Sequence, residues 1–283
     1  MMDKPVHSHN HIRRITLGWV LFTALSFGAA ADDLPALASY RATYDIELVR
    51  AAQLEGLRAA SGKMTYALAD RCDGYTIETD VDLNLAFSNG LTNRVVKHYA
   101  GWESKDGRRS TFRMQIYENG EPEDAYTGTV ELDAEGAGKA VYNGPETIGF
   151  DLPKGTILSS RQLRELIRAA QAATPFLAQS VMDGAFEEGP YRTTGFIAPA
   201  REIVLTPTPI DSVSSRAAAS LLSGRYWPVT LAYFPLDKNP EVPDYELSVQ
   251  LLANGVIRSM TQDYGAYTLS LQLTGLAPVD GGC

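Results

Sequence analysis

The sequence predicts a mainly β protein that folds as one large domain of many antiparallel strands. Short segments that alternate apolar and polar residues, rich in β-branched and aromatic side chains, follow one another between Gly, Asn and Asp turns. One clear helical segment interrupts the series, and the strand and helix alternation typical of parallel sheets is missing. A sheet of this size has to curl, close or split into two layers, because long flat edges promote aggregation.

The expected strands fall into two series around the helix. The first series comprises residues 39–48, 62–68, 75–87, 93–102, 110–119, 125–133, 138–144 and 146–152. The second comprises residues 191–198, 201–207, 226–234, 245–252, 255–264 and 266–273. A second, weaker helix or a loop is expected at 212–224.

The clear helix is expected at the sequence SSRQLRELIRAAQAATP, where Ser159 and Gln162 have the spacing of a capping box and Pro175 limits the helix. Its apolar residues recur at the spacing of one helix face: Leu163, Leu166, Ile167 and Ala170. This face predicts a helix that packs over a sheet or plugs the mouth of a barrel. A lid over a binding cavity is the functional form of the same geometry.

Residues 1–31 have the features of a secretory signal peptide. Basic residues precede the apolar run ITLGWVLFTALSFG, and Ala29 and Ala31 fit a small-residue cleavage signal, so cleavage is expected near Ala31. The run is shorter than the roughly 20 residues that a spanning helix needs. The predicted organisation is therefore a signal peptide at 1–31 and one β domain at 32–283, which is exported and does not span the membrane after cleavage.

Charge argues against several classes of partner. The leader carries three basic residues against one acidic residue, so the net charge of −9 becomes −11 after cleavage. Nucleic acids and anionic membrane surfaces attract basic patches, so neither is an expected partner. Cleavage also removes His7, His9 and His11, which leaves His98 as the one histidine of the mature chain.

Cys72 and Cys283 are the two cysteines of the chain. In an oxidising compartment such a pair is more often joined than free, and closing this long loop removes unfolded-chain entropy worth about 5 kcal/mol. Pairing between molecules through the C-terminal tail is the alternative. Two thiols without neighbouring histidines fall short of a four-ligand zinc site.

The search for catalytic, metal and cofactor motifs finds none. A Ser-His-Asp arrangement would have to use His98, for which a place on a strand is the simpler interpretation. Asp80, Asp82 and Asn84 begin like a calcium loop, but leucines occupy the later glycine and glutamate positions. Strand alternation explains their spacing better, with these three side chains facing water. No enzyme activity and no cofactor are expected.

Aromatic residues are spread along separate predicted strands, and alternation could direct some of them into a barrel lumen. They are candidates for the lining of an apolar pocket or for an ordinary core: Tyr44, Tyr66, Tyr75, Tyr99, Phe112 and Tyr117.

Four segments in order resemble the EipB family of alphaproteobacterial periplasmic proteins: ASYRATYDIEL, SGKMTYALADRCDGYTIETDVDL, FDLPKGTILSSRQLRELIRAA and NGVIRSMTQDYGAYTLSLQLTGL, followed by the final cysteine. The resemblance covers about residues 37–283. It implies a spiral or open β-barrel similar to the LolA and LolB carriers of bacterial lipoproteins, and a role in cell-envelope integrity. It also implies a disulfide between Cys72 and Cys283, a helix at 160–173 and an Asp-Tyr-Gly segment at 263–265.

Three functions follow as expectations. The first is a non-enzymatic periplasmic protein that supports envelope integrity, with a lipid or a lipidated peptide bound in the lumen. The second is a disulfide-stapled module that binds a lipoprotein or another envelope protein through its outer surface. The third is a periplasmic hydrolase, for which His98 is the best candidate residue.

Overall fold

The structure is a computed structural model that describes residues 34–52, 56–184, 189–203, 216–236 and 240–282. The predicted signal peptide and Cys283 lie outside the described residues. The first half of the chain forms eight strands: β1 (Tyr40–Ala51), β2 (Leu57–Asp70), β3 (Gly74–Phe87), β4 (Thr92–Ser104), β5 (Arg109–Glu118), β6 (Glu121–Leu132), β7 (Gly138–Asn143) and β8 (Thr147–Leu152).

The second half begins with the short β9 (Thr156–Leu158) and the helix α1 (Ser159–Gln171). The elements that follow are β10 (Phe176–Met182), β11 (Tyr191–Ile197), β12 (Arg201–Glu202), α2 (Arg216–Leu221), β13 (Arg225–Pro235), β14 (Tyr245–Leu252), β15 (Ile257–Asp263) and β16 (Tyr267–Pro278).

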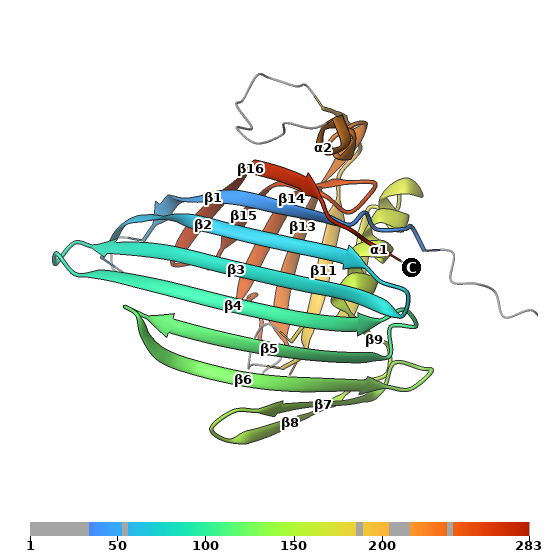
Figure 1. The fold of residues 1–283 in the computed structure, drawn as a ribbon, viewed down its shortest axis with the longest axis horizontal. Helices are drawn as coiled ribbons and strands as arrows, with labels where there is room; N and C mark the ends of the chain where they lie inside the picture. The colour runs from blue at the N-terminus through green and yellow to red at the C-terminus, as the bar shows by residue number, and fades with distance from the viewer. Residues whose placement is uncertain (1–33, 53–55, 185–188, 204–215, 237–239, 283) are drawn as a thin grey trace, which may run out of the picture. The chain divides into compact units, whose positions relative to one another are not determined.

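These strands form a single 16-stranded sheet in which β1 pairs with β16 and so joins the two halves of the chain. The hydrogen-bonded path runs from β8 through β1 and β16 to β9, and the strand pairs are antiparallel except for β9 with β10. The sheet curls into a nearly closed barrel. Figure 1 shows β1–β6 crossing in front of β13–β16, with α1 at one end.

The mainly β, many-stranded antiparallel prediction is confirmed, with local differences. Sequence patterning missed β9 and β10, and the strand expected at 201–207 is described only as β12. The segment at 212–224 contains α2, so its helical interpretation is correct. Residues 133–137 form the turn between β6 and β7, where the Gly136 amide donates to the Asp133 carbonyl at 3.2 Å.

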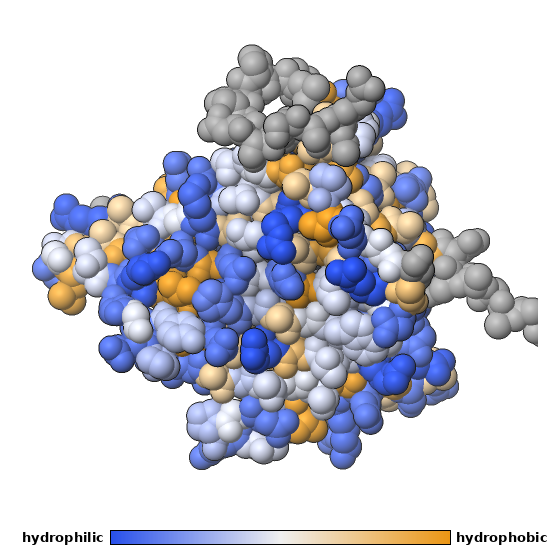
Figure 2. All heavy atoms as spheres, in the orientation of Figure 1, coloured by the Kyte–Doolittle hydropathy of each residue, from blue (hydrophilic) through white to orange (hydrophobic). Residues whose placement is uncertain are grey.

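The core lies inside the barrel and joins its two halves. The largest cluster of buried apolar residues combines inward residues of β1–β3, inward residues of β13–β16 and one face of α1. Two tyrosines of β1 span this interior: the Tyr40 hydroxyl donates to the Gly255 carbonyl at 3.1 Å and the Tyr44 hydroxyl to the Ile257 carbonyl at 2.7 Å. The outward face of β1–β6 is mostly hydrophilic (Figure 2).

The start of α1 is stabilised by a distant carboxylate and not by the expected capping box. Leu158 is the N-cap residue, and no side chain caps the helix locally. The backbone amides of Ser159 and Ser160 instead donate to the carboxylate of Glu103 on β4, at 3.2 and 2.8 Å. Gln162 turns away and donates to the Thr193 hydroxyl at 3.1 Å. The capping-box prediction is therefore wrong, because a buried acceptor already satisfies the orphan amides of the first turn.

Candidate functional site

The interior of the barrel is unevenly buried along β3. Its inward side chains Tyr75 and Ile77 are 3% and 7% exposed, whereas Val81, Leu83 and Leu85, further along the same face, are only half-buried. We call the end of the interior at Tyr75, where α1 packs, the proximal end. The opposite end, at Leu83 and Leu85, is the distal end.

The neighbouring strands show the same gradient. On β4, Glu103 at the proximal end is 2% exposed, whereas Val95 and Lys97 at the distal end are half-buried. On β5, Met114 is 5% exposed and Ile116 is half-buried. Apolar side chains therefore remain partly accessible at the distal end, although burial normally stabilises each by roughly 1.5–3 kcal/mol.

Tyrosines form a continuous row on the inner face, along the edge of the sheet where β11, β14 and β16 begin and β13 ends. The rings of Tyr233 and Tyr245 stack with centroids 4.3 Å apart, and Tyr191 packs edge-on against both at 5.9 and 6.0 Å. Tyr264 continues the row 5.8 Å from Tyr245, and Tyr267 lies 5.0 Å beyond. Stacked and edge-on rings add about 0.5–1.5 kcal/mol per pair to the burial term.

Burial shapes the electrostatics of this row. It raises the pKa of Tyr264 to about 12, with a smaller contribution from Tyr267. The pKa of Tyr245 is also raised, first by burial and then by Tyr233 and Asp183. These hydroxyls stay protonated at neutral pH, and the Tyr264 hydroxyl donates to the side-chain oxygen of Gln262 at 3.4 Å.

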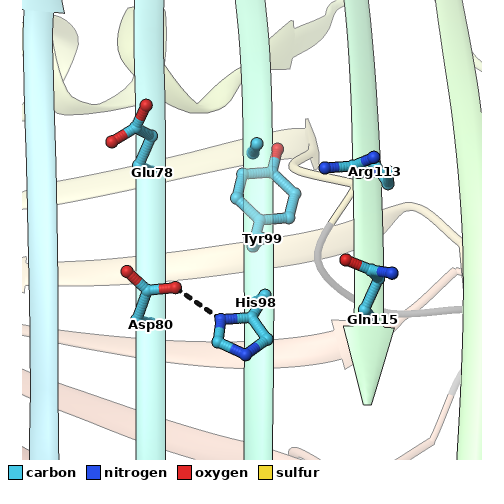
Figure 3. Close-up of a pocket in the computed structure, with 7 residues that line it drawn as sticks. Glu78, Asp80, His98, Tyr99, Arg113 and Gln115 are labelled. Atoms are coloured by element: carbon cyan, nitrogen blue, oxygen red, sulfur yellow. Dashed lines mark hydrogen bonds and ion pairs between the residues drawn. The ribbon is translucent and has the colours of Figure 1, made fainter. Parts of the chain in front are cut away.

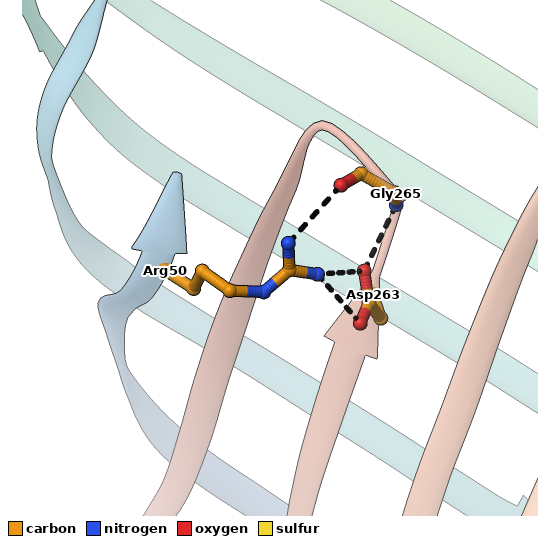
Figure 4. A network of polar contacts seen from close by, with 3 residues as sticks. All are labelled: Arg50, Asp263 and Gly265. Carbon is orange, nitrogen blue, oxygen red and sulfur yellow. Dashed lines mark hydrogen bonds and ion pairs between the residues drawn. The ribbon is translucent and has the colours of Figure 1, made fainter. Parts of the chain in front are cut away.

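The hairpin that carries Tyr264 is fixed by an ion pair from β1. Arg50 reaches both carboxylate oxygens of Asp263, at 3.1 and 3.0 Å, and the Gly265 carbonyl at 3.4 Å (Figure 4). The Gly265 amide donates to Asp263 at 2.9 Å, and its φ of +75° suits glycine. This amide and Arg50 lower the pKa of Asp263. The Asp-Tyr-Gly segment thus forms a turn that holds Tyr264 in the row.

A second aromatic row lies on the opposite half of the sheet. Tyr99 stacks on Phe112 at 6.4 Å, and the row continues through Tyr126, Tyr142 and Phe150. The Tyr99 hydroxyl donates to the Asp183 carbonyl at 3.0 Å, which ties β4 to the segment that follows β10. Burial, followed by Glu103 and Asp183, raises the pKa of Tyr99.

The structure places most of the sequence-selected aromatics inside the barrel. Tyr44 and Tyr75 are buried in the core, and Tyr66 packs against it half-buried. Tyr117 differs: it pairs with Val96 on the outer face, and its ring meets His98 edge-on at 6.0 Å. Strand alternation is the reason, because Tyr117 lies an odd number of residues from the inward Phe112. The tyrosines of β11, β13 and β14 were missed, although the same alternation places them on one face.

The helix residues chosen from the sequence pack against the core at the proximal end. Leu166, Ile167 and Ala170 are buried, and Leu163 is half-buried against the same cluster. With roughly 1.5–3 kcal/mol per buried large side chain, this face holds α1 firmly against the sheet.

The outer face carries a separate polar pocket of about 330 Å³ on β3, β4 and β5, lined by Glu78, Asp80, His98, Tyr99, Ala100, Arg113 and Gln115. The His98 Nδ1 lies 2.7 Å from a carboxylate oxygen of Asp80 (Figure 3). None of the lining residues is a serine, threonine or cysteine, so this pair has no nucleophile beside it for a triad. As strand alternation predicts, Asp80 and Asn84 are exposed, and Asp82 forms an ion pair with Arg94 at 2.6 Å.

The C-terminal tail lies beside the turn that carries Cys72. The Gly282 amide donates to the Asp70 carbonyl at 2.7 Å, and Cys72 is exposed and not a free cysteine. This places the residue before Cys283 next to the β2–β3 turn. The pairing itself stays a prediction, because Cys283 lies outside the described residues.

The described part of the chain contains no helix long and apolar enough to cross a membrane. In the same residues, no three His, Cys, Asp or Glu side chains are grouped in a way that could hold a metal ion.

The fold defines a barrel-type protein with a packed proximal end, a partly accessible distal end and a polar exterior. The family model described as EipB-like matches residues 31–280, and the chain belongs to this family. The chain is 26% identical over 270 residues to the cell envelope integrity protein EipB of Brucella abortus (strain 2308), covering 94% of this chain and 93% of that protein.

A solved structure has the same fold. The crystal structure of a beta-barrel-like protein of a domain of unknown function, DUF1849, from Brucella abortus matches with a TM-score of 0.77. It is 24% identical, and the match covers 87% of this chain and 100% of that chain. The predicted family resemblance is confirmed.

Proposed function

We propose that this chain is a non-enzymatic periplasmic protein that supports cell-envelope integrity by binding the apolar part of a lipid or lipidated peptide at the distal end of its barrel. The observation that carries the proposal is the burial gradient of the interior. Leu83, Leu85, Val95 and Ile116 face inward from three adjacent strands and are half-buried, whereas the proximal positions of these strands are almost fully buried.

The composition of the distal end suits an amphiphile. Apolar side chains of β3–β5 would contact an acyl chain, and the half-buried Tyr264 and Tyr267 offer flat apolar rings. This arrangement supports a carrier similar to LolA and LolB.

Location and role rest on other observations. The predicted leader supports export, and the name of the Brucella relative supports a role in envelope integrity. The tail contact at Asp70 supports a disulfide between Cys72 and Cys283, which suits an oxidising compartment.

The first test is native mass spectrometry of protein isolated gently from the periplasm, followed by organic extraction. A stoichiometric lipid or acylated peptide is the expected result. A mass without ligand, together with a protein partner captured by crosslinking in the same preparation, would contradict it and favour the protein-binding module instead.

A binding assay with a matched pair of variants locates the site. Leu83→Gln places an amide on the inner face, and Val96→Gln places one on the outer face at a residue that is also half-buried. We expect Leu83→Gln to weaken binding of a pyrene-labelled fatty acid about tenfold, the equivalent of about 1.4 kcal/mol, with little change for Val96→Gln. Equal affinity in both variants would refute a distal interior site.

A further inference from the structure

The outer pocket on β3, β4 and β5 is organised as two cross-strand rows. In the first row, Glu78 of β3 and Arg113 of β5 lie on either side of Ala100 of β4. Ala100 has the smallest side chain in either row, whereas Glu78 and Arg113 on the neighbouring strands have long side chains. The surface is therefore lower over β4 than over β3 and β5. The pocket is therefore a hollow between a carboxylate and a guanidinium, and Figure 3 shows Arg113 reaching back toward β4.

The second row closes one end of the hollow. Here Asp80, His98 and Gln115 are cross-strand neighbours, and Asp80 holds the imidazole through Nδ1 at 2.7 Å. The other ring nitrogen of His98, Nε2, takes no part in this contact. Tyr117 packs edge-on against the same ring and restricts its movement further.

The two sides of the hollow differ in how their polar groups are satisfied. Three basic side chains of this face have acidic partners on other strands: Arg41 with Glu78 at 3.2 Å, Lys63 with Asp45 at 2.6 Å and Arg94 with Asp82 at 2.6 Å. Arg113 and Gln115 are different. Within the described ranges, neither side chain has a hydrogen-bond or ion-pair partner. The β5 side of the hollow thus presents unused donors. On the β3 side, the carboxylates of Glu78 and Asp80 each hold one partner and keep further acceptor sites.

We propose that this pocket binds a small zwitterion, an amino acid or a dipeptide, with its carboxylate on Arg113 and Gln115 and its ammonium group on Glu78. A guanidinium forms charge-assisted, bidentate hydrogen bonds with a carboxylate. Adjacent strands lie about 4.8 Å apart, so β3 and β5 are separated by about 10 Å, a width that a short ligand with opposite charges at its ends can bridge. The volume of about 330 Å³ is at the lower end of ligand sites, which excludes large ligands.

This site does not depend on a ligand inside the barrel, because the side chains that would bind the zwitterion, Glu78, Arg113 and Gln115, point outward from the same strands. In a binding site the Asp80–His98 pair positions an imidazole edge against the ligand. No covalent step is required, so the pair needs no nucleophile beside it.

The test compares four probes by two-dimensional amide NMR titration of the mature protein: alanine, dialanine, N-acetyl-dialanine and dialanine amide. The first two are zwitterions, and each of the others keeps one charge. We expect a Kd on the order of a millimolar for a zwitterion, with shifts at the amides of Ala100 and Arg113, and much weaker binding of both blocked peptides. Alanine and dialanine distinguish a free amino acid from a peptide as the source.

Three variants complete the test. Arg113→Gln and Glu78→Gln each remove one charge of the hollow, and each is expected to weaken binding about tenfold. Arg94→Gln is the matched control, because it removes an exposed charge from the same face outside the pocket, and it should leave the affinity within about twofold. The proposal is overturned by the absence of shifts at this site, by equal binding of blocked and zwitterionic probes, or by equal effects of all three variants.

Discussion

Replacing Glu103 separates the hydrogen-bonding role of this residue from the role of its charge. Its carboxylate is 2% exposed and accepts the Ser159 and Ser160 amides at 3.2 and 2.8 Å. Glu103→Ala leaves one buried and one partly buried donor without partners. A buried donor costs about 1–3 kcal/mol and the partly buried one costs less, so we expect a loss of about 2–5 kcal/mol. In a domain of this size each kcal/mol lowers the Tm by about 2–4 °C, which gives a decrease of roughly 4–20 °C.

Glu103→Gln should behave differently at neutral pH. Burial raises the pKa of Glu103, and the hydrogen bonds from Ser160 and Ser159 oppose this only in part. The ionised carboxylate is therefore less favourable in the folded protein than in water. Gln keeps one acceptor oxygen and removes the charge, so the loss of up to about 2 kcal/mol of helix-dipole interaction is offset by relief from desolvation. We expect a change within about 1 kcal/mol.

The pH dependence gives the sign of the charge effect. Above the raised pKa, both folded and unfolded states are ionised, and the folded state bears the full cost of burial. Between that value and the ordinary 4.5, the folded state holds a proton that the unfolded state has lost. Wild type should therefore gain stability relative to Glu103→Gln as the pH falls through this window.

The assay is thermal and urea unfolding of wild type and both variants, followed by circular dichroism from acid to neutral pH. If Glu103→Gln loses as much stability as Glu103→Ala at neutral pH, the charge is essential and the reasoning is refuted. A difference between wild type and Glu103→Gln that does not vary with pH would refute the raised pKa. Far-UV spectra of the native states control for loss of the fold.

Three further predictions concern the tail, the hairpin and the interior. Cys283→Ser should lower the free energy of unfolding by at most a few kcal/mol, about 5 being the upper estimate, and an equal Tm for wild type with and without reductant would contradict it. Because the pKa of Asp263 is lowered, its ion pair stabilises the fold above pH 3.8 and is lost in more acidic solution, so Asp263→Asn and wild type should converge there in Tm. A Cβ at Gly128 would lie 2.0 Å from the Phe112 ring, so Gly128→Ala should cost about 1–3 kcal/mol in urea unfolding, whereas the exposed Gly149→Ala should not.

Strand patterning predicted most of the sheet because alternation is a local property. The strands from 39–48 to 146–152 and from 226–234 to 266–273 were placed to within a few residues, apart from the longer β2 and β16. β10 was missed because its sequence, FLAQSVM, follows a helix end and has little alternation. β9 is three residues long and exists through its parallel pairing with β10, which no local pattern reveals.

The candidate site was predictable only in part, for a physical reason. Alternation places Tyr99 and Phe112 inward and Tyr117 outward. Strict alternation along the strand therefore excludes Tyr117 from the lining of the lumen. By contrast, Glu103 lies 56 residues from the amide of Ser159, and Arg50 lies 213 residues from Asp263. Such contacts depend on how the sheet curls, and a local sequence pattern carries no information about them.

The two ends of the barrel divide stability from binding, and this division limits how variants can be interpreted. At the proximal end, α1, the buried Glu103 and the core form one contact network, so substitutions there change the folded population before they change any interaction with a ligand. At the distal end, Leu83 and Ile116 already contact solvent, and their replacement removes less burial. A loss of envelope function in a distal variant with a wild-type Tm would therefore implicate binding. The same loss in a proximal variant would not, since destabilisation alone lowers the amount of folded protein.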